Sequence, residues 1–422
     1  MPFHCSEGVT EMALFGSRAL LRKLIEETRS SYWFWPSTLV IGGLLLGRGA
    51  IAIDLHPDVL PFDLPDRLTA IDPSSASNTL STLATAVIGV AGVMFSMTLV
   101  AVSFAADTFG PRLIGNFMRD RGTQISFGLL LGTFVFNVIV LRAVQDGDAP
   151  FVPYVGLATA MGLTLMSVFT IIYYIHHVPE TINVSNIASN LGHTFSASIR
   201  GLIDDRSGHE SETVNVAEEA ESHDIALTTT GYIQQLDKKT LVDCARDNDW
   251  VIAVRAGPGD FVTPHQTVMV VTARDALTDK QIKTLQDAFA TGNARTEAQS
   301  TTFIADELVE MIARALSPGF NDPFTAMNCL NWLHAGLLEA LLYDGGLSPH
   351  ETQRVRFQHL DFAGLFQSSF VAAAPYTVTD KMCRERHLAL TKDLLDRATG
   401  ARRDAIADLL PTLSATSPER AL

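Results

Sequence analysis

Four long apolar stretches in the first 175 residues constrain the fold of this chain more than any other feature. They run from about Trp35 to Ile53, Leu80 to Phe104, Ile125 to Leu141 and Val152 to Ile175. A bilayer core about 30 Å thick takes roughly 20 mostly apolar residues as a helix. A soluble protein can bury one such helix, but the rest of this chain cannot cover four of them. The sequence therefore predicts four transmembrane helices.

The remainder of the chain has a different composition. The apolar excess lies almost wholly before residue 176, whereas the acidic residues that give the chain its formal net charge of −15 lie mostly after it. The second half is therefore predicted to be a soluble part with a core of its own. A soluble surface this acidic argues against nucleic acid as a partner, because phosphates need a basic surface.

Charged residues beside the spans indicate how the chain crosses the membrane. The flanks on one side hold seven basic residues: Arg18, Arg22, Lys23, Arg29, Arg112, Arg119 and Arg121. The opposite loops are acidic: Asp54, Asp58, Asp63, Asp66, Asp72, Asp146 and Asp148. Because cytoplasmic flanks carry the excess of Lys and Arg, both termini are predicted to be cytoplasmic. Tyr32 to Trp35 then form an aromatic belt at the inner interface of the bilayer.

The second span carries small residues along one helical face. At steps of three and four residues, the face comprises Thr82, Thr85, Gly89, Gly92, Ser96, Leu99 and Ser103. We call these seven residues the small face, since all but Leu99 are small. Such a face lets another helix approach closely, and its hydroxyls and backbone can also line a narrow water-filled path. Two alternatives stay open: packing inside one subunit, or packing around a symmetry axis with the face turned to a pore.

A basic segment follows this span. Gly110-Pro111 predicts the end of the helix, and Leu113 to Arg121 is typical of a short amphipathic segment on the inner membrane surface. The simpler interpretation is that its arginines set the topology. The alternative is that they attract anions or acidic lipid headgroups to a cytoplasmic mouth. The residues in question are Arg112, Arg119 and Arg121.

The predicted fold class is an all-α membrane part with four transmembrane helices, plus a cytoplasmic α+β part with a small β-sandwich-like unit and C-terminal helices. The predicted domains are a cytoplasmic N-terminal amphipathic segment at 1–33, a four-helix transmembrane domain at 34–177, a helix and acidic linker at 178–224, a small β-rich cytoplasmic unit at 225–274 and a mainly helical cytoplasmic domain at 275–422. Within the β-rich unit, strands are predicted at 228–234, 250–255 and 267–271, with a short helix at 237–247.

Two turns in the soluble part have the composition of functional loops. Gly257 to Asp260 lies between two strands, as in lipoyl-like sandwiches, but no lysine lies there to be acylated. Ser317 to Asn321 joins two apolar helices, and Asp322 is an N-cap before a proline. The second turn is a candidate ligand or interface site, or else a well-capped helix hairpin. Its candidate residues are Arg314, Asn321 and Asp322.

No catalytic or cofactor motif occurs in the sequence, which lacks a Walker loop, a dinucleotide fingerprint, a nucleophile elbow and an H-E-x-x-H pair. The four cysteines are scattered, which favours small buried hydrophobes over a zinc site or a disulfide framework. They are Cys5, Cys244, Cys329 and Cys383. We therefore expect no enzyme activity, no catalytic residue, no metal site and no cofactor.

Three segments together resemble a known family. They are Arg29 to Pro36, Phe109 to Arg121 and Ala315 to Ala326, the last containing Ser-Pro-Gly-Phe-Asn-Asp-Pro. These segments, in this order, are similar to the bacterial membrane-protein family catalogued as domain of unknown function 2254. The resemblance covers about residues 17 to 400 and implies a multi-pass protein of the bacterial inner (cytoplasmic) membrane. It implies no activity and no site residues.

The leading hypothesis is an oligomeric channel or conduit in which the second span lines the path and the cytoplasmic part regulates it. The expected partners are the lipid bilayer, further copies of the same chain and a small ion as permeant. The competing hypothesis is a membrane-tethered sensor or scaffold without transport. A carrier is less favoured, because its midplane site would need broken helices in paired repeats.

Overall fold

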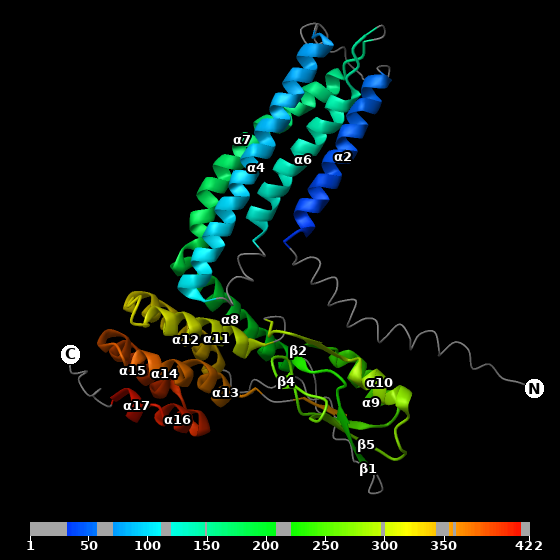
Figure 1. Cartoon of the computed structure of the whole chain (residues 1–422). Coiled ribbons are helices and arrows are strands. Elements are labelled where there is room, and N and C mark those ends of the chain that lie inside the picture. The colour runs from blue at the N-terminus through cyan, green and yellow to red at the C-terminus, as the bar shows by residue number, and fades with distance from the viewer. Residues whose placement is uncertain are drawn as a thin grey trace, which may run out of the picture. The chain divides into compact units, whose positions relative to one another are not determined.

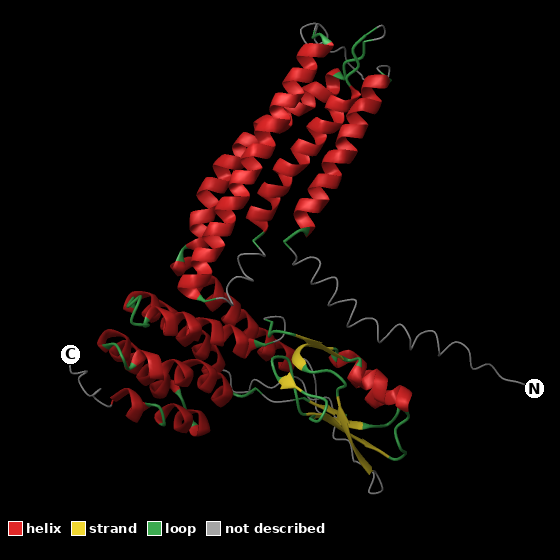
Figure 2. Ribbon diagram, in the orientation of Figure 1, coloured by secondary structure: helices red, strands yellow, loops and turns green. Residues whose placement is uncertain are grey.

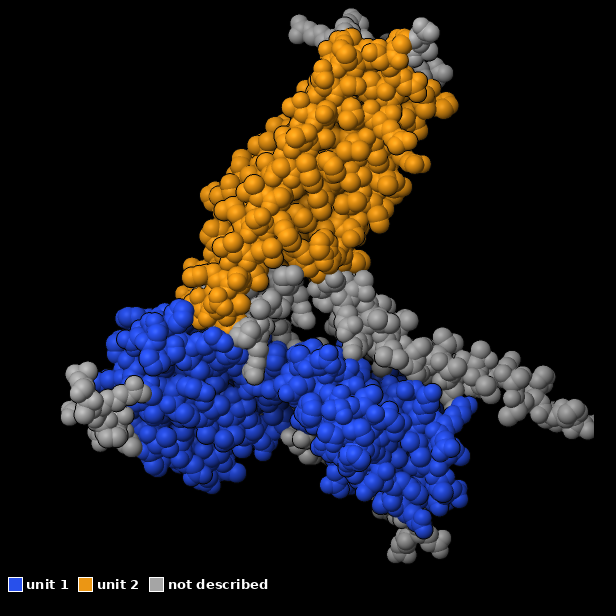
Figure 3. Space-filling view, in the orientation of Figure 1, with its two compact units in different colours: residues 1–26, 187–422 blue, residues 27–186 orange. Residues whose placement is uncertain are grey.

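The chain divides into two units (Figure 3). In a computed structural model of the whole chain, the described residues are 32–56, 71–110, 120–147, 150–207, 221–296, 300–342, 354–357 and 360–414. Residues 27–186 form one unit, here called the membrane unit. Residues 187–422, together with 1–26, form the other, here called the soluble unit.

Four long helices lie side by side in the membrane unit (Figure 1): α2 (Phe34–Leu55), α4 (Pro73–Phe109), α6 (Arg121–Ala143) and α7 (Tyr154–Ile182). Each is long and apolar enough to cross a membrane, which confirms the four predicted spans. α4 has 37 residues. At 1.5 Å per residue it is about 55 Å long, well beyond a bilayer core of about 30 Å. α7 runs through Pro179 to Ile182, so it ends later than predicted.

Four glycines hold α2 against α6. Gly43 and Gly47 lie one turn apart on α2, and Gly128 and Gly132 lie one turn apart on α6. A Cβ added at Gly43 would lie 2.2 Å from the carbonyl oxygen of Gly132, and one added at Gly132 would lie 2.7 Å from the carbonyl oxygen of Leu39. Only glycine lets two backbones approach so closely, as in small-x-x-x-small packing of membrane helices. We call these four residues the glycine seam.

Aspartates connect the ends of the membrane helices. Asp54, near the end of α2, accepts hydrogen bonds from the backbone N–H groups of Val155 (2.9 Å) and Gly156 (3.0 Å) at the start of α7. Asp120 accepts from the N–H of Thr123 (2.7 Å) and lies 2.8 Å from Nε2 of His177. Each carboxylate therefore satisfies N–H groups that a helix start leaves without a partner.

From Ile187 on, α8 (Val184–Ser207) belongs to the soluble unit, where it packs on α11 (Thr301–Ala315) and α12 (Pro323–Leu342). The ring of Trp332 lies against Gly192, where an added Cβ would be 2.5 Å from the indole. The hydroxyls of Ser198 and Thr301 are 2.6 Å apart. The helix predicted within 178–224 is α8, which starts at Val184.

Two small sheets follow. One has the order β1 (Glu221–Ala226), β5 (Thr267–Ala273), β3 (Val251–Val254), β7 (Val355–Arg356), and the other has the order β4 (Phe261–Val262), β2 (Gly231–Leu236), β6 (Phe289–Gly292). β7 pairs in parallel with β3, and all other pairs are antiparallel. α9 (Lys238–Asp247) and α10 (Asp279–Gln286) complete this part. Apolar residues from both sheets, including Ile233, Ile252 and Val262, share one core cluster.

The end of the chain is helical (Figure 2). α13 (Phe362–Phe366) continues through a π-helix, η4 (Gln367–Val371), into α14 (Ala372–Thr377), and α15 (Lys381–Arg397), α16 (Gly400–Ala407) and α17 (Leu410–Ser414) follow. The C-terminal helices predicted within 275–422 are thus several short helices. Gly400, with φ +58, begins α16.

Strand boundaries also differ from the prediction in two places. β1 begins at Glu221, inside the stretch predicted to be linker, and its antiparallel pairing with β5 gives its polar sequence a partner. β2 begins at Gly231 rather than Thr228. The predicted β-sandwich-like arrangement of the two sheets stays a prediction.

Candidate functional site

The small face of α4 lies on the outside of the four-helix bundle. Thr82, Thr85, Gly89, Gly92, Ser96, Leu99 and Ser103 are all exposed. A Cβ added at Gly89 or Gly92 meets no atom of the described residues within 4 Å. The opposite side of α4 is buried, through Leu80, Ala84, Val87, Ala91 and Met94. Packing against another described helix of the same subunit therefore does not cover the small face, and its packing around a symmetry axis with the face turned to a pore stays a prediction.

Hydroxyls on this face bond to their own helix. Ser96 donates to the carbonyl oxygen of Gly92 (3.0 Å), and Thr82 donates to that of Asn78 (2.8 Å). Each hydroxyl hydrogen is thus used, while the oxygen keeps acceptor capacity directed outward. Such a surface can meet another helix closely or accept hydrogen bonds from water.

α4 carries no charge between its ends. The helix is capped by Asp72, whose carboxylate accepts from the N–H of Ser75 at 3.0 Å, and the next charged residue is Asp107. Between them the small face runs without any ionisable group. A neutral face of this kind offers no ion pair or proton relay, and any selectivity would come from the width of a path and its hydroxyls.

Of the three arginines predicted to lie at a cytoplasmic mouth, one is among the residues that the structure describes. Arg121 is exposed at the start of α6. Arg112 and Arg119 lie outside the described residues. The role proposed for these three residues therefore stays a prediction.

The turn between α11 and α12 is a capped hairpin. Asp322 accepts from the N–H of Thr325 (3.1 Å) and from its hydroxyl (2.6 Å). Asn321 is exposed in the left-handed conformation, with φ +47. Arg314 pairs with Glu310 one turn earlier, at 3.5 Å. Asp322 and Arg314 thus make local contacts, and the role of the three residues as a ligand or interface site stays a prediction.

A contact that the sequence did not suggest fastens the Gly257 to Asp260 turn to α11. Gly259, with φ +99, approaches so closely that an added Cβ would lie 2.9 Å from Oγ of Ser300 and 3.4 Å from Nε of Arg295. The Arg295 guanidinium forms an ion pair with Asp306 and lies over the ring of Phe303, 5.3 Å from its centre. One arginine therefore lies against both the backbone turn of the sheets and the first turns of α11.

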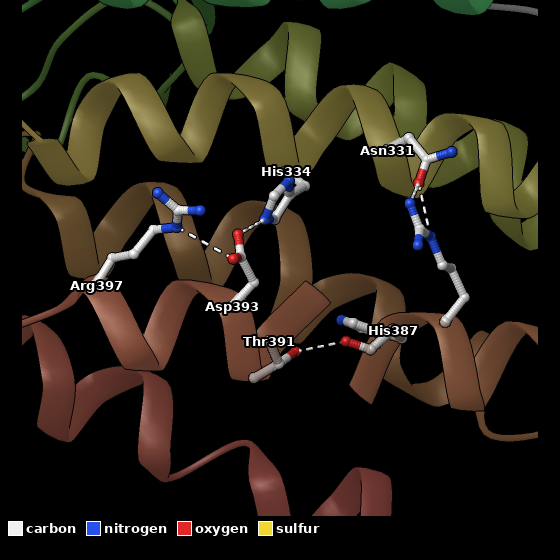
Figure 4. A network of polar contacts seen from close by, with 7 residues as sticks. Asn331, His334, His387, Thr391, Asp393 and Arg397 are labelled. Atoms are coloured by element: carbon white, nitrogen blue, oxygen red, sulfur yellow. Dashed lines mark hydrogen bonds and ion pairs between the residues drawn. The ribbon is translucent and has the colours of Figure 1, made fainter. Parts of the chain in front are cut away.

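Two histidines lie among the C-terminal helices (Figure 4). Nε2 of His334 on α12 lies 2.9 Å from Asp393 on α15, which also accepts from Arg397 at 3.1 Å. His387 is fully buried, with Nδ1 2.8 Å from the hydroxyl of Thr377. Burial lowers the pKa of His387 to about 3, so its ring is neutral at physiological pH. The neutral ring packs edge-on against Phe370 of the π-helix.

The cysteines of the soluble unit have the environment of inert side chains. Cys329 and Cys383 are buried, and burial raises the pKa of each thiol to about 12. Cys244 is half-buried, and burial with neighbouring carboxylates raises its pKa to about 11. A thiol rather than a thiolate at neutral pH is a poor nucleophile and metal ligand. Cys5 lies outside the described residues.

Taken together, the fold is that of a four-span membrane protein with a soluble unit of helices and two small sheets. The chain belongs to the family described as "Predicted membrane protein (DUF2254)", whose model matches residues 29–393. This finding confirms the resemblance seen in the sequence.

Uncharacterized proteins of two mycobacteria are similar to the chain. One is from Mycobacterium bovis and one from Mycobacterium tuberculosis, each 25% identical over 356 residues, which covers 81% of this chain. The chain spans 66% of the length of these relatives. No solved structure matches the chain.

Proposed function

We propose that this protein is a homo-oligomeric channel or conduit of the bacterial inner membrane, with both termini in the cytoplasm. One observation carries the proposal: the small face of α4 lies outside the subunit instead of inside it. Copies that meet around an axis through this face would enclose a narrow neutral path lined by Ser96, Gly92 and their neighbours. A small ion is the proposed permeant.

The length of α4 supports the same proposal. A helix of 37 residues continues beyond a bilayer core that about 20 residues span. A lining helix of that length carries any rotation or tilt from one membrane surface to the other. The soluble unit, whose α8 starts at Val184 directly after α7, is then the proposed regulatory part, and no enzymatic activity, cofactor or metal is assigned to it.

A membrane-tethered sensor or scaffold is the second candidate. It is favoured by the hydroxyls of Ser96 and Thr82, whose hydrogens are satisfied inside α4. Such hydroxyls can pack against another protein helix without water, so oligomers could form with a dry axis.

Reconstitution of the purified protein separates these functions. The channel proposal expects an oligomer by mass measurement, and ion flux in proteoliposomes that is absent from empty vesicles. An oligomer that passes no ion under any condition would support the sensor. A reporter fused after Leu422 should be active only when designed for the cytoplasm, and a periplasmic C-terminus would contradict the proposed orientation.

A further inference from the structure

Asn137 is a fully buried amide inside the membrane unit. Its side chain on α6 has 0% exposure, and neither Oδ1 nor Nδ2 has a hydrogen-bond partner among the described residues. Counted along α6 at 1.5 Å per residue, Asn137 lies about 9 Å from the Ala143 end, within the apolar span. Polar side chains in such positions are rare in membrane helices and are associated with function.

Two buried hydroxyls meet between α6 and α7, and one of them lies on the face of α6 that carries Asn137. Thr133 is one turn before Asn137 and is 1% exposed, and Ser167 on α7 is 2% exposed. Their oxygens are 3.5 Å apart, and Ser167 donates its hydrogen to the carbonyl oxygen of Leu163 at 2.9 Å. The Ser167 oxygen therefore keeps acceptor capacity.

The surroundings of these three side chains are apolar. Toward the Ala143 end lies the cluster that contains Phe136, Val140 and Leu157, and toward the other end lies the cluster that contains Phe127 and Leu130. Transfer of an amide to such an environment without hydrogen bonds is strongly unfavourable. In a bilayer core no bulk water can relieve that cost.

The chemistry of the amide selects the class of ligand. Oδ1 needs a donor and Nδ2 needs an acceptor. A cation would satisfy only the oxygen, and an anion would satisfy only the nitrogen. Residues 133–137 and Ser167 are all uncharged, so none of them would offset the charge of either ion. A water molecule donates and accepts at once, and buried waters make about three hydrogen bonds to groups of this kind.

We propose that Asn137, Thr133 and Ser167 bind a buried water molecule between α6 and α7. The water connects the two helices through hydrogen bonds. The apolar clusters on either side connect them by packing. Leu130 and Phe127 separate the site along α6 from Ser126 and the Asp120–His177 pair, so it is a closed site rather than a part of the permeation path. The inference does not depend on the proposed channel.

Transfer of magnetisation from water to protein tests the site by solid-state NMR in bilayers with deuterated lipid chains. The sequence offers a selective label: Phe-Asn occurs only at Phe136-Asn137 and Phe320-Asn321. Phenylalanine labelled at the carbonyl carbon and asparagine labelled uniformly with ¹³C and ¹⁵N therefore select the backbone nitrogens of these two asparagines, and correlation through Cα, Cβ and Cγ leads from each backbone nitrogen to the side-chain NH₂ of the same residue. The exposed Asn321 is the wet control, and the backbone N–H of Asn137, inside its helix, is the dry control.

The proposal expects the side-chain NH₂ of Asn137 to receive magnetisation from water at a rate comparable with that of Asn321. Thr133→Val combined with Ser167→Ala should lower this transfer at least about twofold, because the water would lose one or more of its roughly three partners. Transfer to the NH₂ no faster than to the backbone N–H of Asn137 in the unmodified protein would overturn the proposal. So would a transfer rate unaffected by the double substitution.

Discussion

The membrane unit contains two surfaces made of small residues, one packed between two helices and the other exposed. The glycine seam of Gly43, Gly47, Gly128 and Gly132 is used inside the subunit, where an added Cβ at Gly43 would lie 2.2 Å from a backbone oxygen. The small face of α4 is left open, and an added Cβ at Gly92 meets nothing described within 4 Å. Small residues therefore make a close helix contact at the glycine seam, whereas on α4 they remain exposed.

The difference indicates what each surface is for. Small residues in membrane helices permit close approach, which gains van der Waals contact where an apolar driving force is missing. The seam realises this gain between α2 and α6. On α4 a partner from outside the subunit could make such van der Waals contact. The hydroxyl oxygens between the glycines could also accept hydrogen bonds from that partner or from water.

The largest effect is expected at the seam. Gly43→Leu places a side chain where only backbone fits, and since a backbone carbonyl cannot move aside, we expect a loss of more than about 3 kcal/mol and little folded protein. Gly42→Leu is the matched control, because a Cβ there meets no described atom within 4 Å. Thermal unfolding in detergent measures both. Equal melting of the two variants would contradict the close α2–α6 contact.

Substitutions in the small face of α4 should affect assembly rather than folding. Gly92→Leu is expected to leave the melting temperature of the subunit nearly unchanged while the oligomer mass falls to that of smaller species, since the bulky chain keeps neighbouring helices apart. Met97→Leu, at an exposed position about 140° around α4 from Gly92, is the control and should assemble normally. Native mass spectrometry reads both masses. Retention of the full oligomer by Gly92→Leu would remove the small face from the interface.

In the soluble unit, the buried His387 contacts Thr377, and the dependence of stability on pH tests whether its ring is neutral in the folded protein. The folded-state pKa of about 3 lies below the ordinary value of 6.5, so the unfolded chain binds the extra proton first as pH falls. Stability is therefore present above pH 6.5 and is lost between 6.5 and about 3, by about 1.4 kcal/mol for each pH unit in that window. His387→Asn, which keeps an acceptor near Thr377, should flatten this part of the pH profile. Parallel profiles for the two proteins would show that His387 does not titrate this way.

The smallest effect is expected at the α11–α12 turn. Asn321 has φ +47, a conformation that costs most residues about 1 kcal/mol. Asn321→Ala should lower stability by about that amount, and Asn321→Gly should be nearly neutral. Chemical denaturation of the two variants checks the difference. A loss of function in Asn321→Gly without loss of stability would revive the ligand-binding alternative for this turn.

Features encoded by neighbouring residues could be predicted from the sequence. Hydropathy located the four spans, and the Asp322-Pro323 pair located the start of α12. Periodicity identified the small face, but it could not show which way the face points, because small residues suit both inward and outward packing. The glycine seam has a signal in the sequence, two pairs of glycines four residues apart, that we did not predict to be a helix contact.

Contacts between distant segments were beyond sequence reasoning. Arg295 meets the turn at Gly259 only after the sheets and α11 pack together. Asn137 is one polar residue in an apolar span, and its full burial follows from the packing of the bundle, not from its neighbours in the chain. β1 was taken for linker because its strand character comes from its pairing with β5.

The central claim is that water lies beside the small face of α4 in the assembled protein. Cysteine modification tests it at two adjacent positions at the same depth, Ser96→Cys and Met97→Cys, after Cys5, Cys244, Cys329 and Cys383 have been replaced by serine or alanine. The reactive thiolate is strongly disfavoured in hydrocarbon, so reaction with a small water-soluble thiol reagent requires water beside the residue. Our account predicts that Ser96→Cys reacts and that its modification changes ion flux in proteoliposomes, whereas Met97→Cys stays inert. Ser96→Cys as unreactive as Met97→Cys, in a protein that passes no ions, would contradict the channel.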